Sequence, residues 1–372
     1  MGLSTALKNI CAFQSGGTPS KANSAYFGGN IPWITTVALN GHSIGAEDAV
    51  DWITEEAIKE SAAKIVPAGS IMVGTRVGIG KVAINTIPMS TSQDIISLIG
   101  IDSDCWDTEF LCRFIQSKSA FLNTQARGAT IKGIKIEVLA GLELPDVPLQ
   151  EQHKIVHVLN TVSDVITARQ IQLRILDDLI KARFVEMSKS SITTPTRMGD
   201  VATYINGYAF KPTDWTTEGL PIIRIQNLND REALYNHYSG TIDSKYQVHT
   251  GDILVSWATH LEAYLWQGGD AWLNQHIFRV KFDKMQINKI YYIYSTEDAL
   301  RQAFKNAHGF KPTMEHIKRS DFEDAIILLP PIEVQNQFAT FVTQVDKSKI
   351  VVRKALDESR VLYESLMQKY FG

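Results

Sequence analysis

The strongest constraint on the fold of this chain is that its sequence repeats itself once. Short stretches of the first half recur in the second half, in the same order and about 185 residues further on. The matched pairs are Ile31–Ile34 with Leu220–Ile223, Gly69–Val73 with Gly251–Val255, Gln93–Ile95 with Gln275–Ile277, Val147–Leu149 with Pro330–Ile332, and Gln152 with Gln335. This ordered set predicts two modules of one architecture within a single chain.

Each repeat ends in a stretch with the pattern of a long helix. Gln150–Met187 contains neither Gly nor Pro, and its apolar residues recur at alternating steps of four and three. The predicted seam is Ile155, Leu159, Val162, Ile166, Leu173, Leu176 and Ile180 in the first repeat; in the second it is Phe338, Phe341, Val345, Val352, Ala355, Leu362 and Leu366, with Ser348 and Ser359 as weak positions. Heptad seams are typical of paired helices. We therefore predict that the two helices pair with each other; the alternative is that each covers only its own module.

The rest of the chain is predicted to be mixed α and β structure. Short β-rich runs, such as 69–74 and 252–256, are broken by Gly, Pro, Asn and Asp and separated by short helical windows. Strands do not alternate regularly with helices, which argues against a doubly wound sheet. We predict an α+β fold with a pseudo-twofold internal repeat. The expected boundaries are residues 1–149 and 191–331 for the modules, and residues 150–190 and 332–372 for the helices.

Composition places the 372-residue chain among ordinary soluble proteins, with 44% hydrophobic and 21% charged residues. No apolar run reaches the roughly 18 residues that a membrane helix requires, and Met1–Ala12 does not resemble a signal peptide. Cys11, Cys105 and Cys112 stand at no metal-binding spacing. We interpret them as reduced thiols and predict a cytoplasmic protein that does not enter a membrane.

The charge of the chain excludes one class of nucleic-acid binder. A net charge of −3, with no basic block along the chain, argues against a generally cationic surface. A local basic surface is still compatible with this sum, because the field near a cleft depends on how charges are arranged. In DNA-binding proteins, internal twofold symmetry corresponds to two half-sites. Since the two modules differ in sequence, two such half-sites would also differ.

Two ordered sets of motifs give the chain a family resemblance. The first half contains Gly16–Ser20, Ile31–Thr35, Pro67–Ile71, Thr75–Lys81, Gly128–Thr130 and Pro148–Gln152; the second contains Gly207–Lys211, Pro221–Ile225, Gly251–Leu254 and Leu329–Pro331. Together they resemble the specificity subunit of type I DNA restriction-modification systems over nearly the whole chain. The second half departs at its helix start, where Val334 and Asn336 flank Gln335. That departure leaves open how tightly this helix start is held.

The resemblance implies a division of labour between this chain and its partners. Two target-recognition domains would each read one half of a split sequence in double-stranded DNA, and two antiparallel helices would act as a ruler between them. The helices would dock two methyltransferase subunits, and endonuclease/translocase subunits would join that complex in phage defence. No cofactor is implied for this chain: S-adenosylmethionine, ATP and Mg are expected on the partner subunits, which carry out adenine-N6 methylation and ATP-dependent DNA cleavage.

The sequence lacks the catalytic and metal-binding motifs considered, which agrees with this division of labour. Pro330-Pro331 lacks the Asn or Asp before it and the aromatic residue after it that an adenine methyltransferase needs to hold a flipped base. Gly74–Lys81 has the wrong spacing for a phosphate-binding loop. The histidines form no cluster suited to a metal. We therefore predict no catalytic residue and no metal site.

Polar and basic residues in glycine-containing loops are the candidate DNA contacts, because Arg pairs with guanine, Gln and Asn suit adenine, and Lys or Thr contacts phosphates. In the first module the candidates are Thr75, Arg76, Lys81, Gln125, Arg127, Thr130 and Lys132. In the second module they are Lys211, Arg224, Gln226, Asn227, Lys311 and Thr313. For the Arg76 loop the alternative is a solvated surface hairpin. Trp257 and Trp266 are interpreted as core or wall residues rather than as residues that stack on bases.

Two other functions remain open from the sequence. One is a stand-alone DNA methyltransferase or nuclease with an unfamiliar site, which would act without any partner protein. The other is a helical scaffold that assembles proteins and does not bind DNA. Salt-dependent DNA binding by the assembled complex would exclude the scaffold.

Overall fold

The computed structural model describes residues 4–41, 43–128, 132–230, 232–257, 261–308 and 318–372. The chain divides into a first unit, Met1–Gln170 with Lys354–Gly372, and a second unit, Ile171–Arg353. The division runs through both long helices, so each unit combines one β-rich module with a part of each helix.

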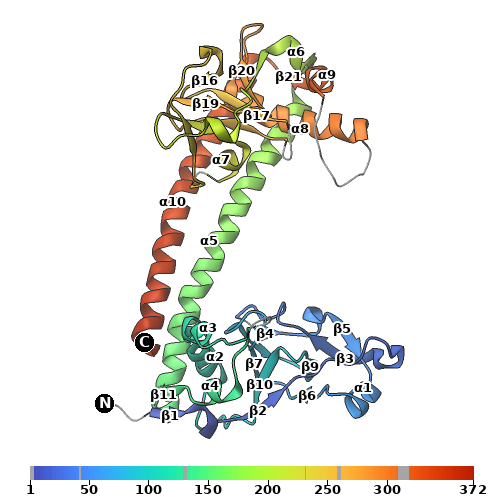
Figure 1. Cartoon of the computed structure of the whole chain (residues 1–372), viewed down its shortest axis with the longest axis vertical. Coiled ribbons are helices and arrows are strands. Elements are labelled where there is room, and N and C mark those ends of the chain that lie inside the picture. Colours follow the sequence, from blue (N-terminus) through green and yellow to red (C-terminus); the bar gives the residue numbers. More distant parts are fainter. Residues whose placement is uncertain (1–3, 42, 129–131, 231, 258–260, 309–317) are drawn as a thin grey trace. The chain divides into compact units, whose positions relative to one another are not determined.

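The first unit contains two sheets and a two-stranded ribbon (Figure 1). The larger sheet has the strand order β2-β10-β7-β8-β4, the smaller sheet has the order β5-β3-β9-β6, and β1 pairs with β11. The strands are β1 (Ser4–Ala6), β2 (Ala12–Ser15), β3 (Phe27–Ile34), β4 (Ser43–Ile44), β5 (Asp51–Ile53), β6 (Ile65–Val66), β7 (Ile71–Gly74), β8 (Val82–Asn85), β9 (Met89–Thr91), β10 (Ile95–Ile99) and β11 (Glu143–Pro145). The α-helices of this module are α1 (Glu55–Glu60), α2 (Thr108–Ser117), α3 (Ser119–Thr124) and α4 (Ile136–Ala140).

The second unit repeats this plan. Its strand orders are β13-β20-β17-β18 and β15-β14-β19-β16, and β12 pairs with β21. The strands are β12 (Thr194–Arg197), β13 (Thr203–Asn206), β14 (Leu220–Ile223), β15 (Asn236–Tyr238), β16 (Gln247–Val248), β17 (Ile253–Ser256), β18 (Ala263–Leu265), β19 (Ala271–Leu273), β20 (Ile277–Lys281) and β21 (Ile326–Leu329). The helices are α6 (Met198–Val201), α7 (Ile225–Asn229), α8 (Lys289–His308) and α9 (Arg319–Asp324).

Apart from β4, the strand orders of the two units correspond strand by strand. Each sheet of the second unit has its counterpart in the first. The sheets β5-β3-β9-β6 and β15-β14-β19-β16 each contain one parallel pair, β3 with β9 and β14 with β19. Within the described residues, β4 has no counterpart in the second unit. The predicted α+β fold with an internal repeat is therefore confirmed.

The two predicted helices are α5 (Leu149–Ser190) and α10 (Ile332–Phe371), and they pack against each other within each unit. In the second unit the Lys349 ammonium lies 2.6 Å from the Asp177 carboxylate, and the rings of Phe184 and Phe338 are 5.5 Å apart. Later residues of α5 therefore meet earlier residues of α10, so the pair is antiparallel. The prediction that the helices pair with each other is confirmed.

The seam predicted for α5 lies inward over its whole length. Ile155, Leu159 and Ile180 are buried, and Val162, Ile166, Leu173 and Leu176 are half-buried. Of the residues predicted for α10, Phe338, Val345 and Val352 are buried, and Phe341, Ala355 and Leu366 are half-buried. Val342 and Leu356, which were not predicted, are buried as well.

One predicted seam residue of α10 is wrong. Leu362 is 51% exposed, and its neighbour Tyr363 lies inward instead. A straight helix drifts by about 20° per heptad relative to a strict 3.5-residue repeat. The inward position has therefore moved on by one residue towards the end of α10, where Leu356 is buried beside half-buried Ala355 and Tyr363 replaces Leu362. The Tyr363 hydroxyl accepts a 3.1 Å hydrogen bond from Arg113, a buried cation that needs partners.

Both long helices start in the same way. The buried side chains of Gln152 and Gln335 each accept a 2.9 Å hydrogen bond from a backbone N–H, that of Asp107 and that of Asn288 respectively. Each amide also donates to a carbonyl just before its helix: Val147 at 2.9 Å and Pro330 at 2.8 Å. The question that the sequence left open is thereby answered, because the start of the second helix is held by the same bonds as the first.

Candidate nucleic-acid interface

The hairpin between β7 and β8 carries the first group of predicted DNA contacts. The Gly74 N–H donates to the Lys81 carbonyl at 2.9 Å, and the Lys81 N–H donates to the Gly78 carbonyl at 3.0 Å. Gly78 has a φ of 67°, a left-handed conformation that glycine adopts without strain. These bonds hold a tight turn on which the side chains of Arg76 and Lys81 are exposed.

A second loop closes on this hairpin. Arg127 and Gly133 exchange two backbone hydrogen bonds of 3.0 Å. The backbone at Gly133 lies so close to the hairpin that an added Cβ would be 3.0 Å from Cγ of Arg76. Lys132, the residue before Gly133, is exposed. The structure thus brings Arg76, Arg127 and Lys132 together at one edge of the first unit, while Thr130 lies outside the described residues.

Thr75 is held inside this loop rather than at its surface. It is 3% exposed, and its hydroxyl and its N–H both donate to the Asp94 carbonyl, at 3.1 and 2.8 Å. Its own carbonyl accepts a 2.9 Å hydrogen bond from the Ile134 N–H. The DNA contact predicted for Thr75 is therefore corrected to a structural role, because its side chain faces the fold.

Asp94 is a neighbour of Arg76 that the sequence analysis did not single out. The guanidinium of Arg76 lies 3.7 Å from the Asp94 carboxylate, and these side chains are 51% and 26% exposed. The sequence signal that could have identified Asp94 was the repeat: Asp94 lies within a matched segment, but the second repeat has His276 at this position. An exposed pair of this kind contributes little to stability, so Arg76 can exchange this carboxylate for a phosphate or a base at small cost.

Two further candidates flank the hairpin. Lys81 lines a surface hollow of about 450 Å³ together with Asn40, Gly41 and Gln116. Gln125 is half-buried, and its side-chain amide donates to the Thr124 hydroxyl at 3.3 Å. Lys81 is therefore the better placed of the two for contact with a ligand outside the fold.

The equivalent loop of the second unit has the same backbone connection and different side chains. The Trp257 N–H donates to the His276 carbonyl at 3.1 Å, as that of Thr75 does to Asp94. The Trp257 indole lies edge-on to the His276 ring at 5.0 Å and stacks on Phe278 at 5.7 Å. With Asn206 and Arg319, Trp257 and Phe278 line a small cavity of about 170 Å³. This agrees with the interpretation of Trp257 as a wall residue.

Arg319 at this cavity was missed in the sequence analysis. Its guanidinium lies 5.8 Å from the centre of the Phe278 ring, donates to the Tyr204 carbonyl at 3.0 Å and pairs with Glu323 at 2.8 Å. A single arginine at a helix start carries no sequence signal, because two of its three partners, Tyr204 and Phe278, come from distant strands.

The candidates predicted for the second module lie around the sheet β15-β14-β19-β16. The Arg224 guanidinium lies 5.3 Å from the centre of the Trp215 ring and donates to the Asn236 side chain at 3.2 Å. Lys211 and Gln226 are exposed. These three polar side chains are placed where a ligand could reach them, whereas Lys311 and Thr313 lie outside the described residues.

Asn227 is the second candidate that the structure corrects. It is 1% exposed; its side-chain oxygen accepts the Arg224 N–H at 3.1 Å, and its amide donates to the carbonyls of Ala233 and Leu234 at 3.2 and 3.3 Å. Its polar atoms are used to close the turn around α7. The base-reading role predicted for Asn227 is withdrawn.

The described residues offer no obvious reactive group or metal centre. Burial raises the pKa of the Cys11 and Cys112 thiols to about 12, and the hydrogen bond with Asp102 raises the pKa of exposed Cys105. The three thiols are therefore protonated near neutral pH, and none is in a disulfide. Within the described ranges no group of three or more His, Cys, Asp or Glu residues could hold a metal ion, and no helix has the length and apolarity to cross a membrane.

Comparison with known proteins decides the family. The family model for the type I restriction modification DNA specificity domain matches residues 4–176 and again residues 193–358. The chain belongs to this family. It is a DNA specificity subunit of a type I restriction-modification system, built from two such domains, and the family resemblance inferred from the motifs is confirmed.

Individual relatives agree with this assignment. The specificity subunit is 24% identical to the type I restriction enzyme MjaIX specificity subunit of Methanocaldococcus jannaschii, over 98% of this chain and 91% of that protein. It is 29% identical to the EcoR124I/EcoR124II specificity subunit of Escherichia coli, over 45% of this chain and 44% of that protein. Membership of a specificity family confirms that the chain is not itself the enzyme of the system.

Solved structures share the fold. The S subunit of a type I restriction-modification system from M. genitalium superposes with a TM-score of 0.55 at 13% identity, over 100% of this chain and 96% of that one. A chain from a structure on complex assembly and conformational transition of the type I R-M system gives a TM-score of 0.64 at 16% identity, over 100% and 97% of the two chains. The two-module architecture is therefore the fold of this family.

Proposed function

We propose that this specificity subunit reads a split target in double-stranded DNA, with residues 1–149 recognising one half-site and residues 191–331 the other. The observation that carries the proposal is the pair of equivalent loops. Thr75 and Trp257 make the same backbone hydrogen bond in their two units, yet the side chains around them are cationic in one unit and aromatic in the other. A shared framework with different exposed side chains is what two unlike half-sites require.

In the first module, the group around Arg76 supplies the chemistry of recognition. Arg76 and Arg127 are suited to bidentate pairing with guanine or to phosphate contacts, and Lys81 and Lys132 to phosphates. Gln125 is a weaker candidate because it is half-buried. Thr130 keeps the role predicted from the sequence.

In the second module, the exposed side chains of Lys211 and Gln226 and the half-buried Arg224 are proposed to contact DNA. The Trp215 ring restricts Arg224, so less conformational entropy is lost when its guanidinium binds. Lys311 and Thr313 keep the roles predicted for them.

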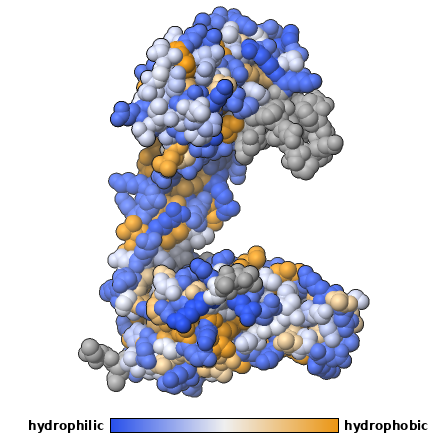
Figure 2. All heavy atoms as spheres, in the orientation of Figure 1, coloured by the Kyte–Doolittle hydropathy of each residue, from blue (hydrophilic) through white to orange (hydrophobic). Residues whose placement is uncertain are grey.

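The long helices are proposed to dock two methyltransferase subunits, with endonuclease/translocase subunits joining the complex. Apolar side chains on α5 and α10 are exposed in both units; they are Val158, Val165, Val361 and Leu362 in the first unit, and Ile171, Ile175, Leu179, Ile350 and Val351 in the second. Figure 2 shows apolar residues, in orange, among polar ones along these helices. Large exposed apolar patches mark interaction sites. In this proposal the complex works in the cytoplasm, and S-adenosylmethionine, ATP and Mg bind to the partners.

Methylation mapping tests the proposal directly. The chain is expressed with its methyltransferase subunit in a host that lacks other adenine methylation, and N6-methyladenine is mapped over the genome. The expected motif is two short, unlike sequences separated by a non-specific spacer. A continuous motif, or methylation of DNA by the purified chain alone with S-adenosylmethionine, would contradict the proposal.

A further inference from the structure

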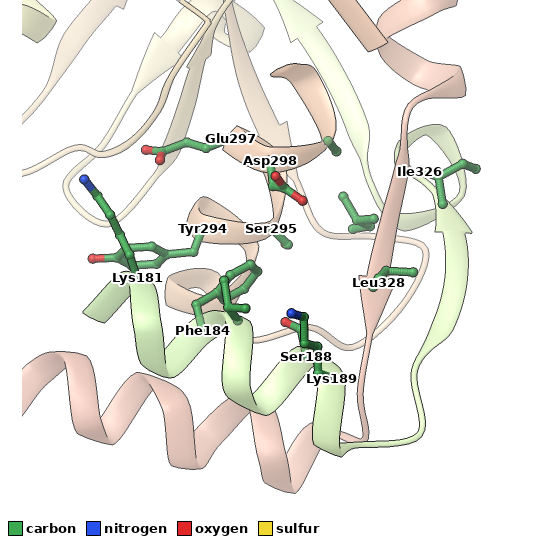
Figure 3. Close-up of a pocket in the computed structure, with 13 residues that line it drawn as sticks. Lys181, Phe184, Ser188, Lys189, Tyr294, Ser295, Glu297, Asp298, Ile326 and Leu328 are labelled. Atoms are coloured by element: carbon green, nitrogen blue, oxygen red, sulfur yellow. The ribbon is translucent and has the colours of Figure 1, made fainter. Parts of the chain in front are cut away.

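A cavity of about 450 Å³ opens in the second unit among α5, α8 and β21 (Figure 3). Phe184 and Ser188 line it from α5, Tyr294 and Ser295 from α8, and Leu328 from β21. An apolar cavity of about 150 Å³ is enough to bind benzene. The space in the second unit is therefore ample for an aromatic ring.

The internal repeat identifies the same place in the first unit. The Gln152 and Gln335 bonds fix the register of α5 against α10, and the caps at Asp107 and Asn288 fix that of α2 against α8. Counting from these anchors, Phe371 is the counterpart of Ser188, and Phe114 is the counterpart of Ser295. Each of the two serines thus stands where the first unit has a phenylalanine.

In the first unit this place is filled. Phe371 is 3% exposed, and its ring centre lies 5.2 Å from that of Phe110 and 6.1 Å from that of Phe114. Its carbonyl accepts a hydrogen bond from the Lys118 ammonium, which fixes the end of α10. The cavity of the second unit is therefore the space that two rings occupy in the first.

The rim of the cavity also differs between the units, but here the second unit has the apolar side chains and the first unit does not. In the second unit, Val185, Ile326 and Leu328 line the cavity and are 47%, 47% and 44% exposed. Their counterparts in the first unit are Gln368, Glu143 and Pro145. The cavity is also lined by Lys181, Lys189, Glu297 and Asp298. The second unit thus combines an open interior with a lining of apolar side chains and a few charged ones, which is typical of a binding site.

We propose that this cavity binds an aromatic side chain of the methyltransferase subunit, in the position that Phe371 fills in the first unit. The proposal rests on the proposed function, because it names the point at which that partner is anchored. Leu179, an exposed apolar residue of the proposed docking surface, precedes Val185 at the rim by six residues of α5, about 9 Å of helix rise. A partner docked on α5 is therefore also within reach of the cavity. A buried aromatic residue in a pocket, surrounded by apolar contacts that exclude water, is the usual anchor of a protein interface.

The test fills the cavity from within. Ser188→Phe restores the ring found in the first unit, and the copurified complex with the methyltransferase subunit is diluted and examined by native mass spectrometry. The expected result concerns one of the two methyltransferase subunits, the one docked at the second unit. Its dissociation constant should be at least tenfold higher than with the wild-type chain. Gln368→Phe, which adds a ring at an exposed position of the first unit, is the matched control and should leave the dissociation constant unchanged.

The outcomes separate this proposal from the proposed function. If the wild-type chain forms no complex with the methyltransferase subunit, the proposed function fails. If the wild-type complex forms and Ser188→Phe assembles equally well, the cavity proposal alone fails. The melting temperature of each variant is measured alongside, and Ser295→Phe, which fills the cavity from α8, replaces Ser188→Phe if that variant unfolds. Cross-linking from a photoreactive residue at Val185 must then capture a methyltransferase peptide with an aromatic residue; a peptide without one overturns the proposal.

Discussion

The β7–β8 loop of the first unit and the β17–β18 loop of the second connect equivalent strands, but the side chains around them differ in kind. The first brings Arg76, Arg127 and Lys132 together, whereas the second presents Trp257 against His276. The bonds that hold both loops run between backbone atoms. Because such bonds do not depend on side-chain identity, the reading residues can differ while the framework is retained.

The buried contacts of the two units show which positions cannot change their residue type. Gln152 and Gln335 are the same residue type because each side chain pairs with backbone groups that would otherwise be buried without partners. Phe371 and Ser188 differ, and the difference leaves a cavity in one unit. At this pair of positions the residue that satisfies the backbone is therefore shared by the units, whereas the residue that only fills space has changed.

The largest expected effect is a change of the target itself. Four residues inserted into α5 after Ile166 lengthen that helix by about 6 Å, which corresponds to one or two base pairs at 3.4 Å each. If the two modules read independently, the methylated motif keeps both half-sites and its spacer becomes longer. Methylation mapping of the variant complex measures this. Full methylation of the original spacing would exclude the helices as the ruler.

Among the substitutions, removal of the Phe371 ring from the first unit should give the largest loss of stability. Phe371→Ala deletes a buried ring beside Phe110 and Phe114 and should cost about 3–5 kcal/mol. Ser188→Ala at the equivalent position should change stability by less than about 0.5 kcal/mol. Hydrogen-exchange protection of β7 and β10, compared with that of β17 and β20, shows which unit has lost stability. Equal losses from the two substitutions would contradict the proposed equivalence of a filled and an empty site.

The helix starts should respond equally to the same substitution. Gln152→Leu and Gln335→Leu each leave a backbone N–H and a carbonyl without their partner, at a cost of about 1–3 kcal/mol. Hydrogen exchange at the first turns of α2 and α8 reports each site. A loss confined to Gln152→Leu would mean that the start of the second helix is held by other contacts.

Loss of a single reading residue should give the most local effect. Arg76→Ala should relax specificity at one base of one half-site by about 1–3 kcal/mol, and Arg224→Ala should do so in the other half-site. Lys81→Ala, a phosphate contact in this scheme, should weaken binding to all sequences alike and reduce the salt dependence. Methylation rates on targets with single-base changes measure these effects. If Arg76→Ala and Arg224→Ala altered the same half-site, the two-module interpretation would fail.

Much of the architecture followed from the sequence by itself. The repeat, the two helices, nearly all of their seam and the family are encoded in patterns that extend over many residues, so a single exception does not alter them. Leu362 was such an exception: heptad counting could not detect the one-residue drift that puts Tyr363 beside Arg113. The exposed reading candidates Arg76 and Lys211 were found because loop position and charge are local properties.

The tertiary structure decided which polar residues face outward and which spaces remain empty. Thr75 and Asn227 have the composition of DNA contacts, yet their hydrogen-bond partners bury them. The cavity beside Ser188 depends on a ring missing from α5 and another missing from α8, helices that are far apart in the sequence. Burial and packing depend on all the segments that meet at a point, and which segments meet is determined only once the chain has folded.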